Sequence, residues 1–334
     1  MKPLKLLFLL ILSFPASAQI QLGADIDGEA ANNRSGWSVS LSSDGTIIAI
    51  GAPYNDGNGS TSGHVRVYEY TSGSWSQLGA DIDGEAASDR SGFSVSLSSD
   101  GTVVAIGATR NAGNGNNAGH VRVYEYTSGS WTQIGADIDS EATGDVSGSS
   151  VSLSSDGTIV AIGAPYNDGT GTDAGHVRVY EDSSGTWVQL GADIDGEAAD
   201  DQSGCLVSLS SDGTILAVGA IFNDGNGSNA GHVRVYEDSS GTWVQLGADI
   251  DGEAAGDFSG YRVSLSSDGS TIAIGAPGNS GNGSYAGHVR LYEYTSGSWS
   301  QLGADIDGEA AGDRSGHSVS LSSDGTILAV GAIF

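Results

Sequence analysis

Apolar and polar residues follow a fixed order along the chain, and this order predicts β-strands. Residues 38–42 (SVSLS) alternate small polar with apolar side chains, which is typical of a half-buried strand. After an Asp-Gly turn, residues 46–52 (TIIAIGA) form a near-continuous apolar run, as in a strand covered on both faces. Residues 64–70 (HVRVYEY) alternate again, and a TSGS turn leads into residues 75–82 (WSQLGADI). No stretch after the first eighteen residues has helical periodicity, so we expect an all-β protein.

The same block returns every 56 residues, opening on Gln-Leu/Ile-Gly-Ala-Asp-Ile-Asp, first at Gln21 and next at Gln77. A period of this size is typical of solenoids, propellers or arrays of small modules. Four antiparallel strands per unit favour a β-propeller blade, because a β-helix needs shorter coils and a sandwich needs more strands. We predict a β-propeller of about six four-stranded blades, the last one incomplete. The repeats are 21–76, 77–132, 133–188, 189–244, 245–300 and a partial 301–334.

The first eighteen residues predict a secretory signal peptide. They combine the basic MKPLK, the short apolar run LLFLLILSF and Ala-Ser-Ala before Gln19. We therefore expect a signal peptide at 1–18, a propeller at 19–334, and a secreted, extracellular or cell-surface location. The exported chain begins with a fourth-strand segment, residues 21–26. A closing clasp beside the last blade is one place for it, although the missing third strand of that blade would leave a gap in the ring. The chain stops inside a second strand, so the full-length protein is expected to have six or seven blades, with a further C-terminal domain left open.

Charge narrows the range of partners. The formal net charge is −29, and both lysines, Lys2 and Lys5, precede Gln19, so the exported chain sets only arginine against 41 acidic residues. Such a surface repels phosphate backbones and anionic lipid, so we expect no nucleic-acid partner and no membrane insertion. We expect a monomer. The single cysteine, Cys205, cannot form an internal disulfide, and we interpret it as a drifted repeat position.

Loop lengths distinguish the two faces of the predicted disc. The SSDG and TSGS turns fall on one face. The loops at 53–63 and 83–92 fall on the other, which we call the long-loop face. Binding residues concentrate on loops held by a rigid scaffold, so this face is the first place to look for a ligand.

Short motifs in each copy resemble the FG-GAP repeat of integrin-α-like β-propellers, in which an aromatic-Gly pair opens one strand and Gly-Ala-Pro closes the next. Gly36 and Ser38-Val39 match the first half, and Gly51-Ala52-Pro53 the second, although Ser35 replaces the aromatic residue. The resemblance implies a propeller. The family's calcium hairpin, D-x-D-x-D-G-x-x-D, is absent. Only Asp44 lies there, and one carboxylate cannot supply the six to eight oxygens that Ca²⁺ requires.

A different acidic segment is the best metal candidate. Asp25 and Asp27 share one side of a strand end, and Glu29 with a more distal carboxylate is predicted to fold back and complete an oxygen cage for calcium. The alternative is that these carboxylates cap turns and staple blades, paired with arginine. No other cofactor is expected. The candidate ligands are Asp25, Asp27, Glu29, Asp81, Asp83, Glu85, Asp89, Asp193, Asp195, Glu197, Asp201, Asp249, Asp251, Glu253, Asp257, Asp305, Asp307, Glu309 and Asp313.

Other recurring side chains have structural interpretations. We expect His64 and its copies to hydrogen-bond a neighbouring loop at the start of a strand. Arg66 and its copies lie mid-strand, where a buried guanidinium needs a carboxylate, and we expect the repeated aspartates to supply it. Trp75 and its copies are expected to pack between blades, with sugar stacking as the alternative. Trp37 has no aromatic consensus among its copies, and we interpret it as accidental.

No nucleophile elbow, phosphate-binding loop, zinc spacing or Cys–His pairing is present, and the copies differ by small drift. We therefore predict that the chain is not an enzyme. The sequence favours a secreted, non-catalytic binding, adhesion or cell-surface module that meets an extracellular protein or glycan through its long-loop face, by repeated weak contacts. The alternatives are a calcium-dependent carbohydrate or matrix binder, the propeller part of a larger secreted hydrolase or lyase, and a spacer.

Overall fold

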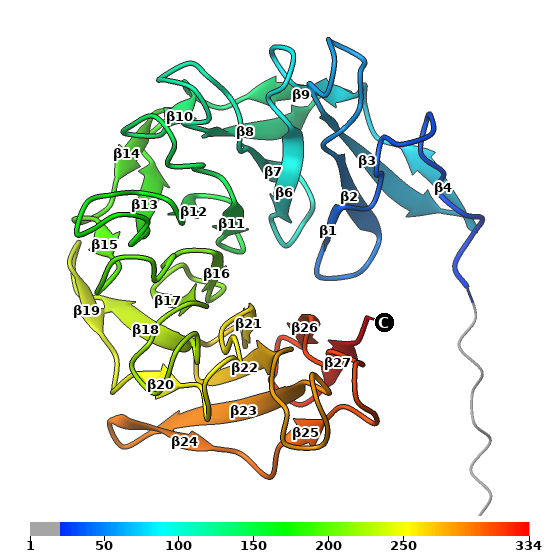
Figure 1. Cartoon of the computed structure of the whole chain (residues 1–334). Coiled ribbons are helices and arrows are strands. Elements are labelled where there is room, and N and C mark those ends of the chain that lie inside the picture. The colour runs from blue at the N-terminus through cyan, green and yellow to red at the C-terminus, as the bar shows by residue number, and fades with distance from the viewer. Residues whose placement is uncertain (1–20, 334) are drawn as a thin grey trace, which may run out of the picture.

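The computed structural model describes residues 21–333 and shows sheets arranged in an arc around a central axis (Figure 1). The predicted signal peptide lies outside the described residues. The first five repeats each form one antiparallel sheet in the order β1-β2-β3-β4, with a short fifth strand that also pairs with the third, and the sixth contributes two strands. The predicted all-β propeller is confirmed. The described residues contain no helix long and apolar enough to cross a membrane.

The two inner strands of each blade follow the predicted pattern. The innermost strands are β1 (Ser38–Leu41), β6 (Ser91–Leu97), β11 (Ser150–Leu153), β16 (Leu206–Leu209), β21 (Arg262–Leu265) and β26 (Ser318–Leu321). The second strands are β2 (Ile47–Ala52), β7 (Val103–Ala108), β12 (Ile159–Ala164), β17 (Ile215–Ala220), β22 (Thr271–Ala276) and β27 (Leu328–Gly331). In β7 every residue is buried, as expected for an apolar run covered on both faces.

The third strands begin at the repeated histidines: β3 (His64–Thr71), β8 (His120–Thr127), β13 (His176–Asp182), β18 (His232–Asp238) and β23 (His288–Thr295). The outer strands are β4 (Ser74–Gln77), β9 (Ser130–Gln133), β14 (Trp187–Gln189), β19 (Trp243–Gln245) and β24 (Ser298–Gln301). The short fifth strands are β5 (Ile82–Asp83), β10 (Ile138–Asp139), β15 (Ile194–Asp195), β20 (Ile250–Asp251) and β25 (Ile306–Asp307).

The predicted single fourth strand at 75–82 is broken in two. β4 pairs with the far end of β3, and β5 pairs with its first two residues, in the register His64↔Asp83 and Val65↔Ile82. Gly79 lies in the break with φ +76°, a conformation that suits glycine and lets the chain leave the sheet and return. The break holds Asp81 opposite the start of β3.

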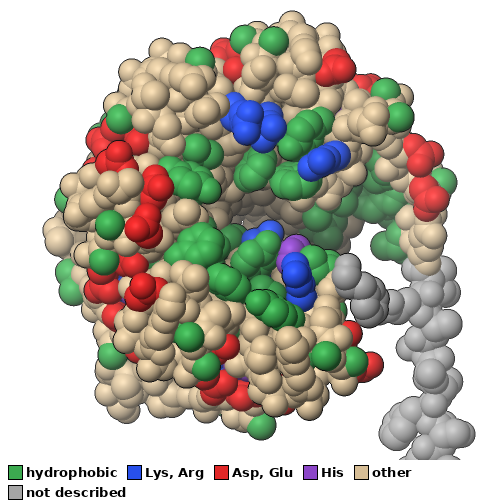
Figure 2. Space-filling view, in the orientation of Figure 1, with side chains coloured by type: hydrophobic (Ala, Val, Ile, Leu, Met, Phe, Trp, Pro, Cys, Tyr) green, Lys and Arg blue, Asp and Glu red, His purple; other side chains and the backbone are tan. Residues whose placement is uncertain are grey.

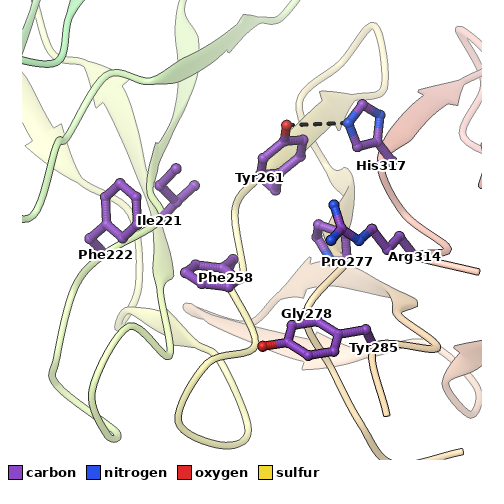
Figure 3. Close-up of a pocket in the computed structure, with 9 residues that line it drawn as sticks. All are labelled: Ile221, Phe222, Phe258, Tyr261, Pro277, Gly278, Tyr285, Arg314 and His317. Carbon is purple, nitrogen blue, oxygen red and sulfur yellow. Dashed lines mark hydrogen bonds between the residues drawn. The ribbon is translucent and has the colours of Figure 1, made fainter. Parts of the chain in front are cut away.

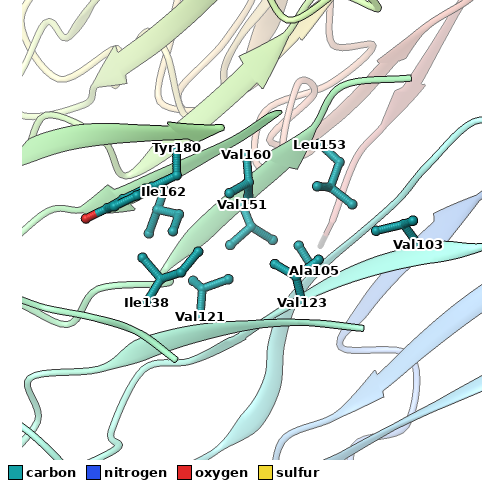
Figure 4. Packing of buried hydrophobic residues seen from close by; sticks show 10 residues of the cluster. All are labelled: Val103, Ala105, Val121, Val123, Ile138, Val151, Leu153, Val160, Ile162 and Tyr180. Carbon is teal, nitrogen blue, oxygen red and sulfur yellow. The ribbon is translucent and has the colours of Figure 1, made fainter. Parts of the chain in front are cut away.

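The cores lie between blades rather than within them. Figure 4 shows one such core, in which Val121 and Val123 of β8 face Val151 and Leu153 of β11. Val121 is fully buried and Val151 is 8% exposed. Because each sheet is covered on both sides by its neighbours, each buried Val or Ile contributes about 1.5–3 kcal/mol.

Polar and close backbone contacts also join the blades. The Ser99 amide donates to the Ser155 carbonyl of the next blade at 2.8 Å, and this contact repeats from Ser43 to Ser323. The Leu97 amide donates to Ser40 Oγ at 3.0 Å. A Cβ added at Gly107 would collide with the Gly148 carbonyl oxygen, so glycine at this position permits the close approach of neighbouring blades.

The segment at 21–27 packs on the first blade, not beside the last one as a closing clasp. Trp75 Nε1 donates to the Leu22 carbonyl at 2.9 Å, and Arg66 donates to the Asp27 carbonyl at 2.7 Å. The same contacts join each pair of neighbouring blades from the first to the fifth, for example from Trp131 to Leu78 at 2.8 Å. Residues 21–27 thus occupy the place that a preceding blade's outer segment takes elsewhere.

Candidate functional site

The copies differ most in chemistry at a few positions of the long-loop face, and those side chains gather around the mouth of the central channel. One repeat position carries Arg34, Arg90, Val146, Gln202, Phe258 and Arg314. A second carries Trp37, Phe93, Ser149, Cys205, Tyr261 and His317. A third carries Tyr54, Arg110, Tyr166, Phe222 and Gly278. Apolar and arginine side chains surround the opening in the space-filling view (Figure 2).

The first two repeats build an exposed group of aromatic and guanidinium side chains, which we call the Trp37 patch: Arg34, Trp37, Tyr54, Arg90 and Phe93. Trp37 lies 5.6 Å from Phe93 and 6.3 Å from Tyr54, measured between ring centroids. The Arg34 and Arg90 guanidiniums lie 4.3 and 4.8 Å from the centre of the Tyr54 ring, within the range of a cation–π contact. Trp37 is 46% exposed, so its ring is accessible.

The fourth to sixth repeats build a concave site, which we call the Tyr261 pocket, with a volume of about 250 Å³ (Figure 3). Its lining comprises Ile221, Phe222, Phe258, Tyr261, Pro277, Gly278, Tyr285, Arg314 and His317. The Tyr261 hydroxyl lies 3.2 Å from His317 Nε2. Burial, then Arg262 and Arg314, lowers the pKa of His317, so the imidazole is neutral at pH 7. The pocket offers mostly apolar walls with one guanidinium and one hydrogen-bonded Tyr–His pair.

The backbone beneath these side chains is left-handed. All six residues at the Arg34 position have φ between 50° and 58°, and none is glycine. Tyr285, in the pocket, has φ 53°. A non-glycine residue, above all the β-branched Val146, pays a steric cost in this region, and such strain is concentrated at functional sites. The fold therefore keeps side chains here although glycine suits the backbone better.

Positive charge on this acidic protein is divided between two places. Five arginines are buried in the third strands: Arg66, Arg122, Arg178, Arg234 and Arg290. The other five described arginines stand at the variable positions or beside them: Arg34, Arg90, Arg110, Arg262 and Arg314. Acidic side chains lie toward the rim of the same face (Figure 2). Every solvent-accessible cation within residues 21–333 thus belongs to the long-loop face near the channel.

The predicted acidic ligands do not come together as one four-carboxylate cage. The distal carboxylate is 3% exposed in Asp89, and its Oδ2 accepts the Ala86 amide at 2.9 Å and the Asn111 side-chain amide at 3.2 Å. Asp145, Asp201 and Asp257 accept the same two donors. This member of the predicted set caps the loop, as the alternative interpretation expected.

Three other residues of each repeat do come together. Glu85, His120 and Asp137 place one ligand atom each within 4.8 Å of the other two, and the arrangement recurs in five copies. His120 Nδ1 lies 3.9 Å from Glu85 Oε2, 3.6 Å from Asp137 Oδ2 and 3.9 Å from Asp139 Oδ1. Burial, then the nearby Arg122, lowers the pKa of His120, and burial raises the pKa of Glu85. The five groups, called here the Glu–His–Asp clusters, are centred on His64, His120, His176, His232 and His288.

Comparisons with known proteins now add to this geometry. Residues 24–68 and 138–180 match the family model of the FG-GAP repeat. These two segments are similar to the FG-GAP repeat. Among curated proteins no match is found. The predicted resemblance is thereby confirmed for these two segments, and repeats of this kind are typical of extracellular proteins.

Solved structures share this propeller fold at low identity. A protein assigned as a 6-phosphogluconolactonase from Bacteroides uniformis is 13% identical, with a TM-score of 0.59 over 88% of this chain and 77% of its own. The periplasmic gluconolactonase PpgL of Pseudomonas aeruginosa is 17% identical, with a TM-score of 0.58 over 88% and 77%. The hydrazine synthase of Kuenenia stuttgartiensis is 12% identical, with a TM-score of 0.57 over 94% and 77%.

These neighbours overturn the prediction that the chain is not an enzyme. Two of the three are lactonases built on the same propeller frame, so near-identical blades without a known catalytic motif are no argument against catalysis. At 12–17% identity the similarity supports the fold alone and does not identify a substrate for this chain.

The turn between the first two strands, where the FG-GAP family has its calcium hairpin, holds the single carboxylate Asp44 in the first blade. Asp44 Oδ1 accepts the Thr46 amide at 2.9 Å and the hydroxyls of Thr46 and Ser42 at 2.7 and 2.8 Å. The carboxylate closes the turn between the first two strands. One turn-bound carboxylate does not fit a Ca²⁺ site.

Two further expectations need correction. The buried arginines are not paired with aspartate side chains. Arg122 donates to the Asp83 backbone carbonyl at 2.7 Å, and its Nη1 lies 3.7 Å from Glu85 Oε1. The repeated histidines do not hydrogen-bond a neighbouring loop, because neither ring nitrogen of His120 or His288 has a hydrogen-bond partner.

Trp37, which the sequence analysis interpreted as accidental, contacts Tyr54, Phe93 and Arg34 in the Trp37 patch. Reading the repeats for what they share hides this patch. The patch is found from the repeat positions at which the copies differ in side-chain chemistry. Trp75 and its copies pack between blades as predicted, for example Trp131 against the core formed by the first two repeats.

Proposed function

We propose that this exported FG-GAP propeller binds an anionic glycan at the channel mouth of its long-loop face. The observation that carries the proposal is the concentration of all accessible arginine at one place on a protein with a formal net charge of −29. A guanidinium recognises a carboxylate through two parallel hydrogen bonds. Exposed indole and phenol rings next to it offer flat apolar faces for a sugar ring.

The rim of the face limits the size of the ligand. Acidic side chains around the mouth repel a long polyanion, whereas a short ligand with one or two carboxylates reaches the arginines without crossing the rim. The Trp37 patch supplies two arginines and three rings, and the Tyr261 pocket supplies one arginine in a concave apolar site. Uronic-acid oligosaccharides combine a ring with a carboxylate and suit both places.

The test is calorimetric titration with trigalacturonate, using the uncharged cellotriose as the control ligand. We expect binding of trigalacturonate and none of cellotriose, and at least a tenfold loss of affinity in Tyr54→Ala and Arg90→Gln. Tyr166→Ala is the matched control, because it occupies the same repeat position and is 41% exposed, and no arginine is stacked on its ring in the described part of the chain.

Equal binding by all variants, or equal binding of both sugars, would contradict the proposal. Product analysis of the same mixtures decides whether the bound sugar is also cleaved. Cleavage that is lost in His317→Gln would make the Tyr261 pocket a catalytic site for the ligand that the mouth binds.

A further inference from the structure

The Glu–His–Asp clusters lie outside the Trp37 patch and the Tyr261 pocket and have no part in the function proposed above. Four of them join two blades, and the first, centred on His64, joins the segment before the first blade to that blade. Glu85 stands in the connection that leaves the first blade, His120 begins the third strand of the second, and Asp137 lies in the break of that blade's outer strand. Their separation in sequence hides this juxtaposition, and only the packing of one blade on the next creates it.

The imidazole is the decisive member of each cluster. His120 is 1% exposed, and its Nδ1 faces carboxylate oxygens without accepting or donating a hydrogen bond. The distances from Nδ1 to Glu Oε2 and Asp Oδ2 run from 3.5 to 4.0 Å over the five copies. An N–H···O hydrogen bond needs about 2.7–3.2 Å, so a proton shared between these atoms does not account for the geometry.

The same distances suit ligands that share a metal ion. Two ligand atoms bound at about 2.0–2.2 Å in tetrahedral geometry lie about 3.4 Å apart, close to the observed separations. One imidazole and two carboxylates leave at least one coordination position for water or a ligand, as in open zinc sites. The all-oxygen set that Ca²⁺ prefers is not what the fold gathers.

Charges around the cluster also suit a divalent cation. In the second repeat, Glu85, Asp137 and Asp139 approach the imidazole, and Arg122 is the one nearby cation among the described residues. Arg122 approaches Glu85 Oε1 while Oε2 faces His120, so the guanidinium fixes the glutamate and leaves one oxygen directed at the imidazole. Three carboxylates against one guanidinium leave two negative charges for one divalent ion to neutralise.

We propose that the Glu–His–Asp clusters bind divalent transition-metal ions, with Zn²⁺ as the ion that fits best. The second to fifth clusters are equivalent. The first is the weakest site, because Glu29 Oε2 accepts a hydrogen bond from the Asn55 side chain at 3.1 Å. Each ion clamps the connection from one blade to the third and outer strands of the next.

The test is the number of Zn²⁺ ions bound by the untagged protein, measured by equilibrium dialysis and elemental analysis, together with the unfolding temperature with and without zinc. We expect four or five ions per chain for five clusters, and a rise in unfolding temperature with Zn²⁺ that an equal concentration of Ca²⁺ does not produce.

A matched pair of variants separates the clusters from general acidity. The first changes the cluster glutamates, as Glu85→Gln, Glu141→Gln, Glu197→Gln and Glu253→Gln. The second removes the same charge from exposed glutamates of the third strands, as Glu125→Gln, Glu181→Gln, Glu237→Gln and Glu293→Gln. We expect at most one bound ion in the first variant and wild-type stoichiometry in the second.

The fourfold cluster variant removes the carboxylates beside buried arginines, which can prevent folding. If that variant does not fold, the single change Glu85→Gln replaces it in the test. It is expected to lose one ion and the intensity of one site in the visible absorption of the Co²⁺-loaded protein. Equal zinc binding by Glu85→Gln and Glu125→Gln, or a wild-type protein that binds no zinc, would overturn the proposal.

Discussion

Single residues at the channel mouth hold side chains where the backbone favours glycine. Val146 has φ 58° and stands at the repeat position that also carries Arg90 and Phe258. Its amide donates to the Asn117 carbonyl at 3.1 Å, so the loop geometry is fixed by the backbone and does not depend on the side chain. The side chain at this position is therefore free to vary, at a steric cost.

Replacing Val146 by glycine tests that cost. We expect Val146→Gly to raise the free energy of unfolding by about 0.5–1 kcal/mol, because relief of the left-handed strain exceeds the added entropy of the unfolded chain. Val151→Gly is the control. The same substitution at this buried strand position is expected to lower the free energy of unfolding by about 3 kcal/mol. Denaturant unfolding of both variants gives the values, and a loss of stability in Val146→Gly would contradict the interpretation.

At the scale of strands and blades, the closest contacts are between backbones. Gly107 is the last but one residue of β7, where the next blade's Gly148 carbonyl approaches it, and the added Cβ of alanine has no room. We expect Gly107→Ala to lower the free energy of unfolding by about 2–4 kcal/mol, because a backbone neighbour cannot move aside as a flexible side chain does. Thermal unfolding measures the effect.

Gly129→Ala is the comparison for that experiment. No atom lies within 4 Å of a Cβ added at Gly129, although φ there is +91°. Only the backbone strain of about 1 kcal/mol is expected. If the two variants lose equal stability, close packing of the blades is not the reason for glycine at the end of the second strand.

The strands themselves were predictable because a two-residue period is a local property. The apolar run of β7 correctly indicated a strand buried on both faces, whereas the alternation of β8 predicted the strand but not the burial of its first five residues. The broken outer strand was not predictable, since one glycine in an otherwise strand-like segment does not reveal a departure from the sheet. The Glu–His–Asp clusters could not be predicted from the local sequence either. The aspartate and glutamate were singled out, but the histidine was assigned elsewhere, because the three meet only after two blades pack.

For the whole molecule, the short-turn face carries a ring of carboxylates that resist protonation. Six aspartates close the turns between the first two strands, and each has a lowered pKa: Asp44, Asp100, Asp156, Asp212, Asp268 and Asp324. For Asp268 the cause is the Ser270 amide, followed by the hydroxyls of Ser266 and Ser270. In Asp324 the Ser322 and Thr326 hydroxyls and the Thr326 amide lower the pKa to about 2.

This ring predicts the acid behaviour of the fold. A carboxylate whose pKa is lower in the folded than in the unfolded chain stabilises the fold above the unfolded value of 3.8. That contribution is lost as the pH falls through the folded value. We expect Asp268→Asn to be less stable than wild type at pH 6 and the two proteins to converge near pH 2. Urea unfolding at both pH values is the measurement, and a constant difference between them would show that the ionised carboxylate contributes nothing.

The left-handed loop positions at the channel mouth have a consequence for how such a protein changes over generations. The same backbone geometry accepts arginine, valine, glutamine and phenylalanine at one position, so a codon change there alters the surface of the channel mouth without disturbing the cores between blades. Duplication of a blade adds another copy of its strands together with another set of these variable loop positions. The propeller thus combines a constant framework with a few variable surface positions, as an immune receptor does. Randomising the codons of those positions is a direct way to search for new binding specificities.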